Sequence, residues 1–286
     1  MARIYTLVNQ KGGVGKTTSA ISIGAYLGQY GQRVLLIDLD PQANASSSLG
    51  VDKRKVQTGT YEILIGQAPI ASHILTNQRF KISLLPSSPA LAGAEIELID
   101  IPQRENRLKD AIQSVIPRYD YILIDCPPSL SLLTVNGLVA AQNGVLIPVQ
   151  CEYLALEGIG QLAQTLTRVQ ASLFPQLSVR GVILTMYDGR TRLGQDVVSE
   201  VRKFFPHQVF QTLIPRSIRL AEAPSYGEPI NVYAPNSTAA SAYAKLTREL
   251  LQQDGVKISN NGRVEKQVPD QVEQAHQPAA PGSGLE

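Results

Sequence analysis

The glycine-rich stretch VNQKGGVGKTTSA, from Val8 to Ala20, constrains the fold of this chain more than any other part of its sequence. It follows an apolar segment, Arg3 to Val8, that is typical of a buried strand. It leads into an apolar-periodic segment, about Thr17 to Tyr30, that is typical of a helix. A strand, a glycine loop and a helix in this order favour phosphate binding, because the loop N–H groups and the positive helix N-terminus face the same anion.

The loop departs from the ordinary Gly-x-x-x-x-Gly-Lys-[Ser/Thr] pattern at its first position. Gly15, Lys16 and Thr17 match the last three places, but Gln10 stands where the first glycine is required. Lys11 follows this departure directly, so the loop carries two lysines. Judged from the residues alone, Lys11 is either a solvated loop lysine or a second cation for the phosphates.

The chemistry of the pattern gives individual residues a role. Lys16 is expected to reach the β- and γ-phosphates of a nucleotide, the Thr17 hydroxyl to hold Mg²⁺, and Thr18 to donate to the α-phosphate. Glycine is needed because its backbone adopts angles closed to other residues, so that successive N–H groups converge on phosphate oxygens. An unrelated glycine-rich turn is the alternative. The predicted site for ATP and Mg²⁺ comprises Lys11, Gly12, Gly13, Val14, Gly15, Lys16, Thr17 and Thr18.

Acidic residues follow two further apolar runs. Asp125 ends YILID, the Walker B position, and is expected to bind Mg²⁺ directly or through water. Asp40, in DLDPQ, is expected to orient or deprotonate the attacking water beside the metal, with Asp38 behind it. Each aspartate, taken singly, could instead cap a helix or form a turn. Lys16 and Asp40 are the predicted catalytic residues, and Lys11 joins them if it is the second cation for the phosphates.

The remaining pattern predicts an α/β fold, a mostly parallel twisted sheet with helices on both faces, of the P-loop NTPase type with a deviant Walker A loop. Continuous apolar runs, typical of buried parallel strands, are RVLLID, KISLLP, YDYILIDCPP, NGVLIPVQ and VRGVILTMYD. Helical patterns alternate with them at Glu95 to Val115, Leu130 to Ala141, Leu156 to Leu173, and Gly194 to Phe204. Ser237 is expected to cap a last helix that runs to about Gln253.

Composition divides the chain into two parts. Residues 1–256 are predicted to form one ATPase domain. Residues 257–286 are polar and rich in Pro, Gln and Gly, so they are expected to form a disordered tail. The formal net charge is only +2, so nucleic-acid binding would need a local basic patch. No signal peptide and no apolar run of about 18 residues is found, so a cytoplasmic protein without a membrane partner is expected.

Six blocks in order resemble the ParA/Soj chromosome-partitioning ATPases, within the larger ParA/MinD group. The resemblance extends from about Ala2 to Leu251. The blocks are KGGVGKTT, LLIDLDPQANASSSLG, YDYILIDCPPSL, PVQCEYLALEG, TMYDGRTRLG and IPRSIRLAEAPSYGEPI. In that family an extra lysine crosses a dimer interface and contacts the phosphates of the other subunit, and Lys11 matches its position. The resemblance therefore implies a homodimer that forms when ATP is bound.

The resemblance also implies further contacts. Arg190 and Arg219 match positions at which the family's ATP-bound dimer holds double-stranded DNA without reading its sequence, and the nearby candidates are Arg192, Arg202, Lys203 and Arg216. Met186 and Pro215 match positions near the adenine, which backbone groups would recognise. A ParB-type partner that stimulates hydrolysis, and a location on the nucleoid, are implied as well.

Three alternatives remain open. A membrane-patterning ATPase like MinD would need a basic amphipathic C-terminal helix, which Pro269, Pro278 and Pro281 oppose. A reductase-type relative would use Cys126 and Cys151 for an iron–sulfur cluster between subunits, whereas buried apolar cysteines are the simpler interpretation. A positioning ATPase for a protein cluster or microcompartment would share the nucleotide and DNA chemistry and differ only in its partner.

Overall fold

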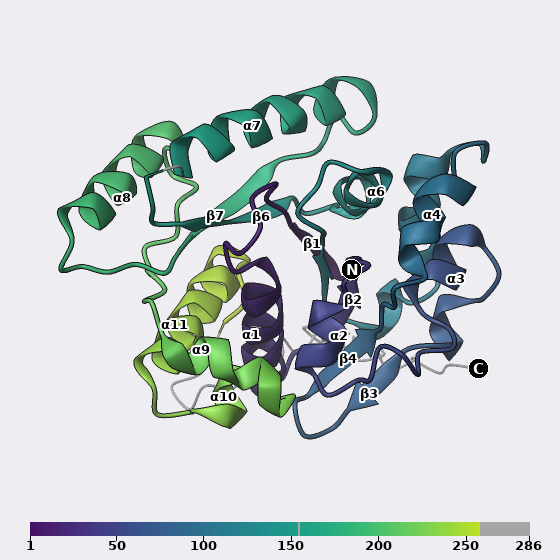
Figure 1. Cartoon of the computed structure of the whole chain (residues 1–286), viewed down its shortest axis with the longest axis horizontal. Helices are drawn as coiled ribbons and strands as arrows, with labels where there is room; N and C mark the ends of the chain where they lie inside the picture. Colours follow the sequence, from purple (N-terminus) through teal and green to yellow (C-terminus); the bar gives the residue numbers. More distant parts are fainter. Residues whose placement is uncertain (154, 258–286) are drawn as a thin grey trace, which may run out of the picture.

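A computed structural model describes residues 1–153 and 155–257 of the 286-residue chain. Its centre is a seven-stranded sheet with the strand order β3-β4-β2-β5-β1-β6-β7 (Figure 1). All neighbouring strands run parallel except β3, which pairs antiparallel with β4 at one edge. The strands are β1 Arg3–Leu7, β2 Val34–Asp38, β3 Leu75–Asn77, β4 Ile82–Leu85, β5 Tyr121–Asp125, β6 Val145–Gln150 and β7 Val179–Thr185.

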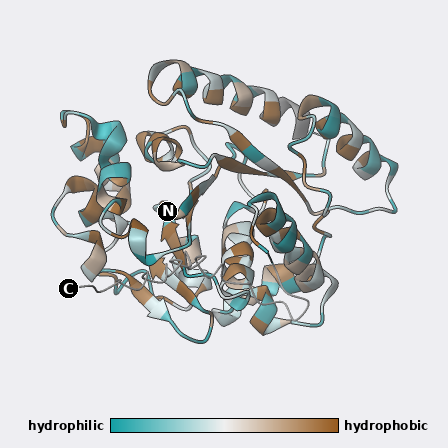
Figure 2. Cartoon of the chain, turned by 180° about the vertical axis from the view of Figure 1, so that it is seen from behind, coloured by the Kyte–Doolittle hydropathy of each residue, from teal (hydrophilic) through white to brown (hydrophobic). Residues whose placement is uncertain are grey.

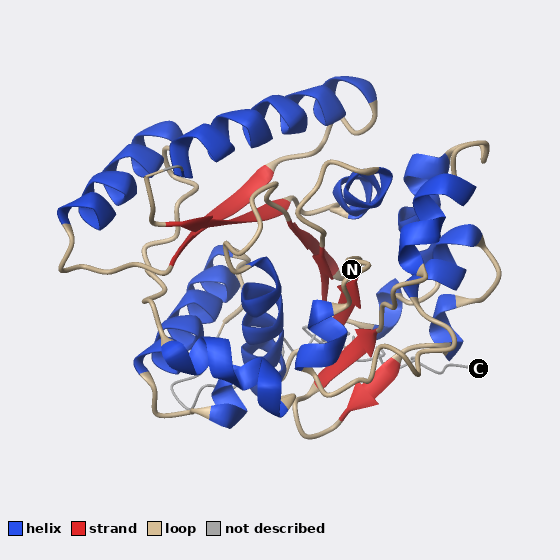
Figure 3. Cartoon of the chain, viewed as in Figure 1, coloured by secondary structure: helices blue, strands red, loops and turns tan. Residues whose placement is uncertain are grey.

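Helices cover both faces of the sheet, as Figure 3 shows. The α-helices are α1 Lys16–Gln29, α2 Asn44–Ser48, α3 Thr60–Ile65, α4 Leu91–Glu97, α5 Arg107–Ile112, α6 Leu132–Ala140, α7 Ala155–Ser172, α8 Arg192–Phe204, α9 Ile218–Glu222, α10 Ile230–Tyr233 and α11 Thr238–Gln253. Short 3₁₀ helices are η1 Ile70–Ser72, η2 Arg104–Asn106, η3 Ile116–Arg118 and η4 Ala223–Tyr226. The predicted α/β class and its mostly parallel sheet are confirmed.

The central strands are apolar throughout because both of their faces are buried. In β1, Tyr5 packs into the core beneath α1 and α11, whereas Ile4 packs into the core on the opposite face. A third apolar cluster lies beneath α7 and α8. Hydrophobic residues accordingly concentrate on the strands in Figure 2. Within the described parts of the chain, no helix is long and apolar enough to span a bilayer.

The prediction of one continuous helix over Glu95 to Val115 is wrong. The chain instead forms α4, a turn, η2 and then α5. Pro102 lies within the predicted span, and a proline in a helix interior removes a backbone donor and clashes with the preceding turn. Side chains stabilise the break, because Asn136 of α6 donates to the Arg104 carbonyl and accepts from the Leu108 N–H.

The sheet topology brings the predicted acidic residues together. The register pairs Leu7 with Asp125 and Asp38 with Asp125, so β1, β2 and β5 end at the same level. The glycine loop leaves β1 at this level and enters α1. Ligands of open α/β sheets bind at such carboxyl ends. The predicted tail is described only to Lys257, and the remainder of that prediction lies outside the described residues.

Candidate nucleotide-binding site

The glycine loop is held from both sides by side-chain hydrogen bonds. Asn9 donates to the Pro148 carbonyl at 2.7 Å and accepts from the Lys11 N–H at 3.0 Å. The Thr185 hydroxyl, at the end of β7, donates to the Val14 carbonyl at 2.8 Å. Gly15, with φ 89°, turns the chain into α1, in a conformation that disfavours any residue with a Cβ. The loop is therefore preorganised.

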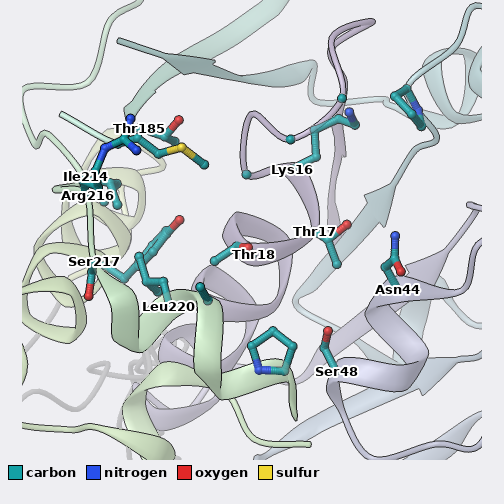
Figure 4. Close-up of a pocket in the computed structure, with 18 of the residues that line it drawn as sticks. Lys16, Thr17, Thr18, Asn44, Ser48, Thr185, Ile214, Arg216, Ser217 and Leu220 are labelled. Atoms are coloured by element: carbon teal, nitrogen blue, oxygen red, sulfur yellow. The ribbon is translucent and has the colours of Figure 1, made fainter. Parts of the chain in front are cut away.

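A cleft of about 760 Å³ opens above the loop (Figure 4). The loop and the start of α1 form its floor, α2 forms one wall, and the segment after β7 with α9 forms the other. Its lining residues are Gly12, Gly13, Gly15, Lys16, Thr17, Thr18, Asp40, Gln42, Asn44, Ser48, Pro128, Thr185, Met186, Ile214, Pro215, Arg216, Ser217, Ile218, Leu220, Ala221, Pro224 and Tyr243. Such a volume is typical of small-molecule sites.

Lys16 places its ammonium group at the base of this cleft. The residue is 7% exposed, and its Nζ donates to the Lys11 carbonyl at 3.1 Å. Burial lowers the pKa of Lys16, and the nearby charges of Asp125 and Asp40 act in the opposite direction. A buried cation with one neutral acceptor has donors to spare for an anion.

Asp125 lies behind Thr17 and is fully buried. The Thr17 hydroxyl donates to its Oδ2 at 2.7 Å, while its Oδ1 has no hydrogen-bond partner among the described residues. Burial first, and then the charge of Asp38, raise the pKa of Asp125 to about 8. A hard cation beside the Thr17 and Asp125 oxygens would give Oδ1 a partner and would favour the ionised form of Asp125. Oxygen is the ligand that Mg²⁺ prefers. The residues present therefore fit the expected metal.

Asp38 has a structural role in the same region. Its Oδ2 accepts from the N–H and the hydroxyl of Ser46, at 2.8 and 2.7 Å, and its Oδ1 accepts from the Asp40 N–H at 3.2 Å. Burial raises the pKa of Asp38 to about 6, against these hydrogen bonds. Asp38 thus fixes α2 and the segment that carries Asp40, which agrees with its expected place behind the site.

Asp40 reaches the cleft from this fixed segment. Its residue is 5% exposed, and its Oδ1 accepts from the Gln42 N–H at 2.9 Å. The Ser87 hydroxyl donates to its backbone carbonyl at 2.8 Å. A buried, oriented carboxylate beside the Lys16 end of the cleft meets the geometric requirement for a group that positions water.

Lys11 does not line the cleft of its own chain. Its side chain is 32% exposed at the rim, where Nζ lies 3.7 Å from Oε2 of Glu152. Two lysines of one loop thus differ in placement, because Lys16 is buried at the base and Lys11 lies at the edge. Val14 also stays outside the cleft with a buried side chain, so only its backbone could contact a phosphate.

The predicted adenine-side residues, Met186 and Pro215, both line the cleft. Met186 has a φ of 52°, a left-handed conformation that is uncommon for non-glycine residues. A parallel bridge joins Tyr187 to Pro215, and the Arg216 N–H donates to the Tyr187 carbonyl at 3.1 Å. Backbone hydrogen bonding therefore fixes this wall.

The predicted DNA-contacting residues fall into two groups. Arg190, Arg192, Arg216 and Arg219 lie on the two segments that the Tyr187–Pro215 bridge joins. Arg202 and Lys203 lie at the far end of α8, roughly 15 Å along its axis from Arg192. Four of the six form ion pairs, namely Arg190 with Asp188, Lys203 with Glu200, Arg216 with Glu152 and Arg219 with Glu222.

The two cysteines lie in separate apolar clusters. Cys126 is fully buried with residues of the α4–α6 side, and Cys151 packs with residues beneath α7 and α8. Burial raises the pKa of Cys126 well above its ordinary value and that of Cys151 to about 11. Both thiols therefore stay protonated near neutral pH and pack as small apolar groups.

Sequence reasoning missed several lining residues. Asn44 and Ser48 come from α2, Gln42 from the segment that precedes it, and Tyr243 from α11. The Tyr243 hydroxyl shares a 3.0 Å hydrogen bond with the Ser19 hydroxyl of α1. The segment after Asp40 was part of the motif LLIDLDPQANASSSLG, so its polar residues gave a usable signal, whereas nothing local marks Tyr243.

Comparison with known proteins agrees with this geometry. A family model described as an AAA domain matches residues 2–179. The chain is 50% identical, over 87% of its length and 98% of the relative's, to the sporulation initiation inhibitor protein Soj of Bacillus subtilis. It is 49% identical, over 89% of its length and 99% of the relative's, to the chromosome-partitioning ATPase Soj of Treponema pallidum. The chain belongs to the Soj/ParA family of chromosome-partitioning ATPases.

A solved structure of a Soj/ParA-like fold extends the comparison to the cleft. Cobyrinic acid a,c-diamide synthase from Mycobacterium smegmatis, with a bound ATP analogue and magnesium, has a TM-score of 0.79 to this chain. The two are 38% identical, and the similarity covers 89% of this chain and 96% of the other. The fold thus carries an ATP analogue and magnesium in that protein, and the predicted P-loop ATPase fold is confirmed.

Proposed function

We propose that this Soj/ParA ATPase hydrolyses ATP to ADP and phosphate as part of a DNA-partitioning cycle. ATP binding joins two chains into a sandwich dimer, the dimer binds double-stranded DNA without reading its sequence, and hydrolysis releases it. A ParB-type partner stimulates hydrolysis, and the cycle segregates chromosome or plasmid origins on the nucleoid in the cytoplasm. Features of the cleft and its rim support the ATP-dependent steps, whereas the ParB-type partner and the nucleoid location are proposed from membership of the family.

ATP with Mg²⁺ is the ligand of the cleft. The N–H groups from Gly12 to Thr18 and the N-terminus of α1 receive the phosphates, and Lys16 neutralises the β- and γ-phosphates. Thr17 and Asp125 would hold Mg²⁺, which would supply positive charge to the bound phosphates. Asp40 orients the attacking water and accepts its proton.

The observation that carries the proposal is the position of Lys11. Its ammonium group lies at the rim of the cleft, outside the lining of its own site, while Lys16 already serves that site. A cation at this rim can reach the phosphates of a second chain that faces it. Two triphosphates between two chains then meet four lysines, so the nucleotide becomes part of the interface, as with an arginine finger supplied in trans.

DNA binding follows from the same dimerisation. Arg190 and Arg219 do not line the cleft, and each forms an exposed ion pair. Exposed pairs are worth only about 0–1 kcal/mol, so DNA phosphates can displace the carboxylate partners at small cost. A dimer presents the cations of two chains together, which multiplies the affinity for one duplex. ATP thus controls DNA binding although the net charge is low.

The deciding experiment measures DNA affinity without nucleotide, with ADP and with ATP, for the wild type and Lys11→Ala together. Tight, salt-dependent binding is expected only for the wild type with ATP. Equal binding in all nucleotide states would contradict the proposal. A titration of ATPase activity with candidate partner proteins then identifies the cargo, because a protein-cluster or microcompartment positioning ATPase would respond to a different partner.

A further inference from the structure

Glu152 occupies a fixed position at the end of β6. Its N–H donates to the Gln150 carbonyl at 2.8 Å, and the Gln150 side-chain amide donates to its Oε1. The preceding Cys151 N–H donates to the Thr185 carbonyl of β7 at 3.0 Å. Glu152 therefore lies in the bend that follows β6, two residues after Gln150, and backbone hydrogen bonds tie this bend to the sheet beside the glycine loop.

This one carboxylate pairs with two cations from different segments, the glycine loop and the segment that carries Pro215. Oε2 lies 3.7 Å from Nζ of Lys11, at the edge of the glycine loop, and Oε1 lies 3.4 Å from a guanidinium nitrogen of Arg216. Arg216 belongs to the wall that carries Pro215, and it lines the cleft, whereas Lys11 does not. Among the side chains that the structure describes, those of residues 1–153 and 159–257, no other carboxylate forms an ion pair with Lys11.

We infer that Glu152 is a positioning residue, which retains Lys11 at the rim of its own chain and thereby sets how readily Lys11 moves to a second chain. The inference rests on the proposed function of Lys11 in trans. The Lys11 and Glu152 side chains are 32% and 42% exposed, so the pair is weak and reversible. Pairs of this kind are worth at most about 1 kcal/mol, or roughly a fivefold change in an equilibrium constant.

Arg216 shares the carboxylate and so weakens the hold on Lys11. Loss of the Glu152 charge should release Lys11, whereas loss of the Arg216 charge should leave the carboxylate to Lys11 alone. The two substitutions Glu152→Gln and Arg216→Ala are therefore expected to act in opposite directions on Lys11. A residue with a merely structural role at the end of β6 would give no such reversal of sign.

The first measurement is the acetylation rate of individual lysines in the nucleotide-free chain, determined by mass spectrometry. Glu152→Gln should raise the rate at Lys11 severalfold and leave Lys203 unchanged, and Arg216→Ala should lower the rate at Lys11. Glu200→Gln is the matched control, because Glu200 pairs with Lys203 at 2.7 Å and has a similar exposure of 47%. It should raise the rate only at Lys203. An unchanged rate at Lys11 in Glu152→Gln overturns the inference.

The second measurement is the dimer dissociation constant with Mg²⁺ and a non-hydrolysable ATP analogue, from sedimentation. Glu152→Gln should tighten the dimer by up to roughly 25-fold, because two chains each release one lysine, and Glu200→Gln should not. A dimer that is equally tight or weaker in Glu152→Gln overturns the inference. If the wild type forms no dimer, the proposed function fails instead, and the acetylation rates still report whether Glu152 retains Lys11.

Discussion

Two buried clusters lie at opposite ends of the mostly parallel sheet, one built around a single carboxylate and one around three. They differ in how many hydrogen-bond donors surround each carboxylate. The strand-start cluster consists of Asp254 with Arg3, Tyr5, Tyr121 and Arg180, at the beginnings of β1, β5 and β7. The strand-end cluster consists of Asp38, Asp40 and Asp125.

Hydrogen-bond donors of the protein itself satisfy the carboxylate of Asp254. Its side chain is 2% exposed, and it accepts from Tyr5 and Tyr121 at 2.7 and 2.8 Å and from Arg180 at 2.7 Å. Burial, and then the charge of Asp254, raise the pKa of both tyrosines above their usual range, so they remain donors. This cluster ties the end of α11 to three strands.

In the strand-end cluster, by contrast, the protein does not supply a donor to every carboxylate oxygen. Lys16 interacts with the charges of both Asp125 and Asp40, and one oxygen of Asp125 has no partner within the described residues. Burial raises the pKa values of Asp125 and Asp38 to about 8 and about 6. Buried charge without donors costs free energy. The comparison teaches that satisfied carboxylates hold a fold together, whereas a shortage of donors marks the place where a ligand must supply positive charge.

The largest expected effect is the loss of the strand-start cluster. Asp254→Ala leaves two arginines and two tyrosines without their acceptor and should lower the free energy of unfolding by about 3–5 kcal/mol. Chemical denaturation measures this loss, and ATP binding by the folded fraction should persist. Unchanged stability would show that the strand-start cluster holds nothing together.

The second effect is an increase in the free energy of unfolding. In metal-free and nucleotide-free protein, Asp125→Asn should raise stability by a few kcal/mol at pH 8, while abolishing Mg²⁺-dependent hydrolysis. The folded Asp125 keeps its proton up to about pH 8, whereas the unfolded carboxyl loses its proton near about pH 4. Between these pH values only the unfolded carboxyl ionises, which favours the unfolded state, so the wild type loses stability increasingly as pH rises through this window.

Thermal denaturation of the wild type and Asp125→Asn from about pH 5 to pH 8 tests this sign. The stability gain of the variant should grow with pH and should be smallest at the acid end. Asp254→Asn is the matched change in the strand-start cluster and should destabilise at every pH in this range. A gain from both substitutions would remove the distinction between the clusters.

A smaller effect comes from the hydroxyl that joins the loop to the strand-end cluster. Thr17→Ala removes the 2.7 Å hydrogen bond to Asp125 and one oxygen ligand for Mg²⁺. The affinity for Mg²⁺–ATP should fall roughly tenfold, as expected for the loss of one interaction of about 1.4 kcal/mol. Thr17→Ser keeps the hydroxyl and should bind normally in calorimetry. Equal losses in both variants would indicate a packing defect.

The smallest effect lies outside both clusters. Arg219→Ala should weaken DNA binding severalfold and reduce the salt slope by about one, with ATP binding intact. Arg33→Ala is the matched control, because Arg33 is also exposed and paired, with Asp120, but precedes β2 at the strand-start end. DNA titrations at several salt concentrations distinguish them. A loss confined to Arg33→Ala would place the DNA surface at the other end of the sheet.

The strand-end site was largely predictable from the sequence because its signals are local. Glycines, Lys16, Thr17 and the aspartates stand next to apolar runs, and a parallel sheet brings the ends of such runs together. Asp40 lines the cleft, and Asp125 lies directly behind Thr17. The roles of these residues in hydrolysis stay predictions.

The strand-start cluster was not predictable because its contacts span the whole chain. Asp254 meets Tyr5 across 249 positions, and no local pattern announces that pairing. The short strand β3 and helix α2 were missed for related reasons. Residues of β3 are mostly exposed, and α2 depends on the hydrogen bonds of Ser46 to the distant Asp38. The salt bridge of Glu152 to Arg216 likewise joins two motifs that sequence alone leaves apart.

The central claim is that Lys11 completes the strand-end site of a second chain, since its own site already holds Lys16. Sedimentation with Mg²⁺ and a non-hydrolysable ATP analogue tests this claim most directly. The wild type should sediment as a dimer, and Lys11→Ala should bind the analogue yet remain a monomer. A Lys11→Ala chain that forms the same dimer as the wild type would contradict the account.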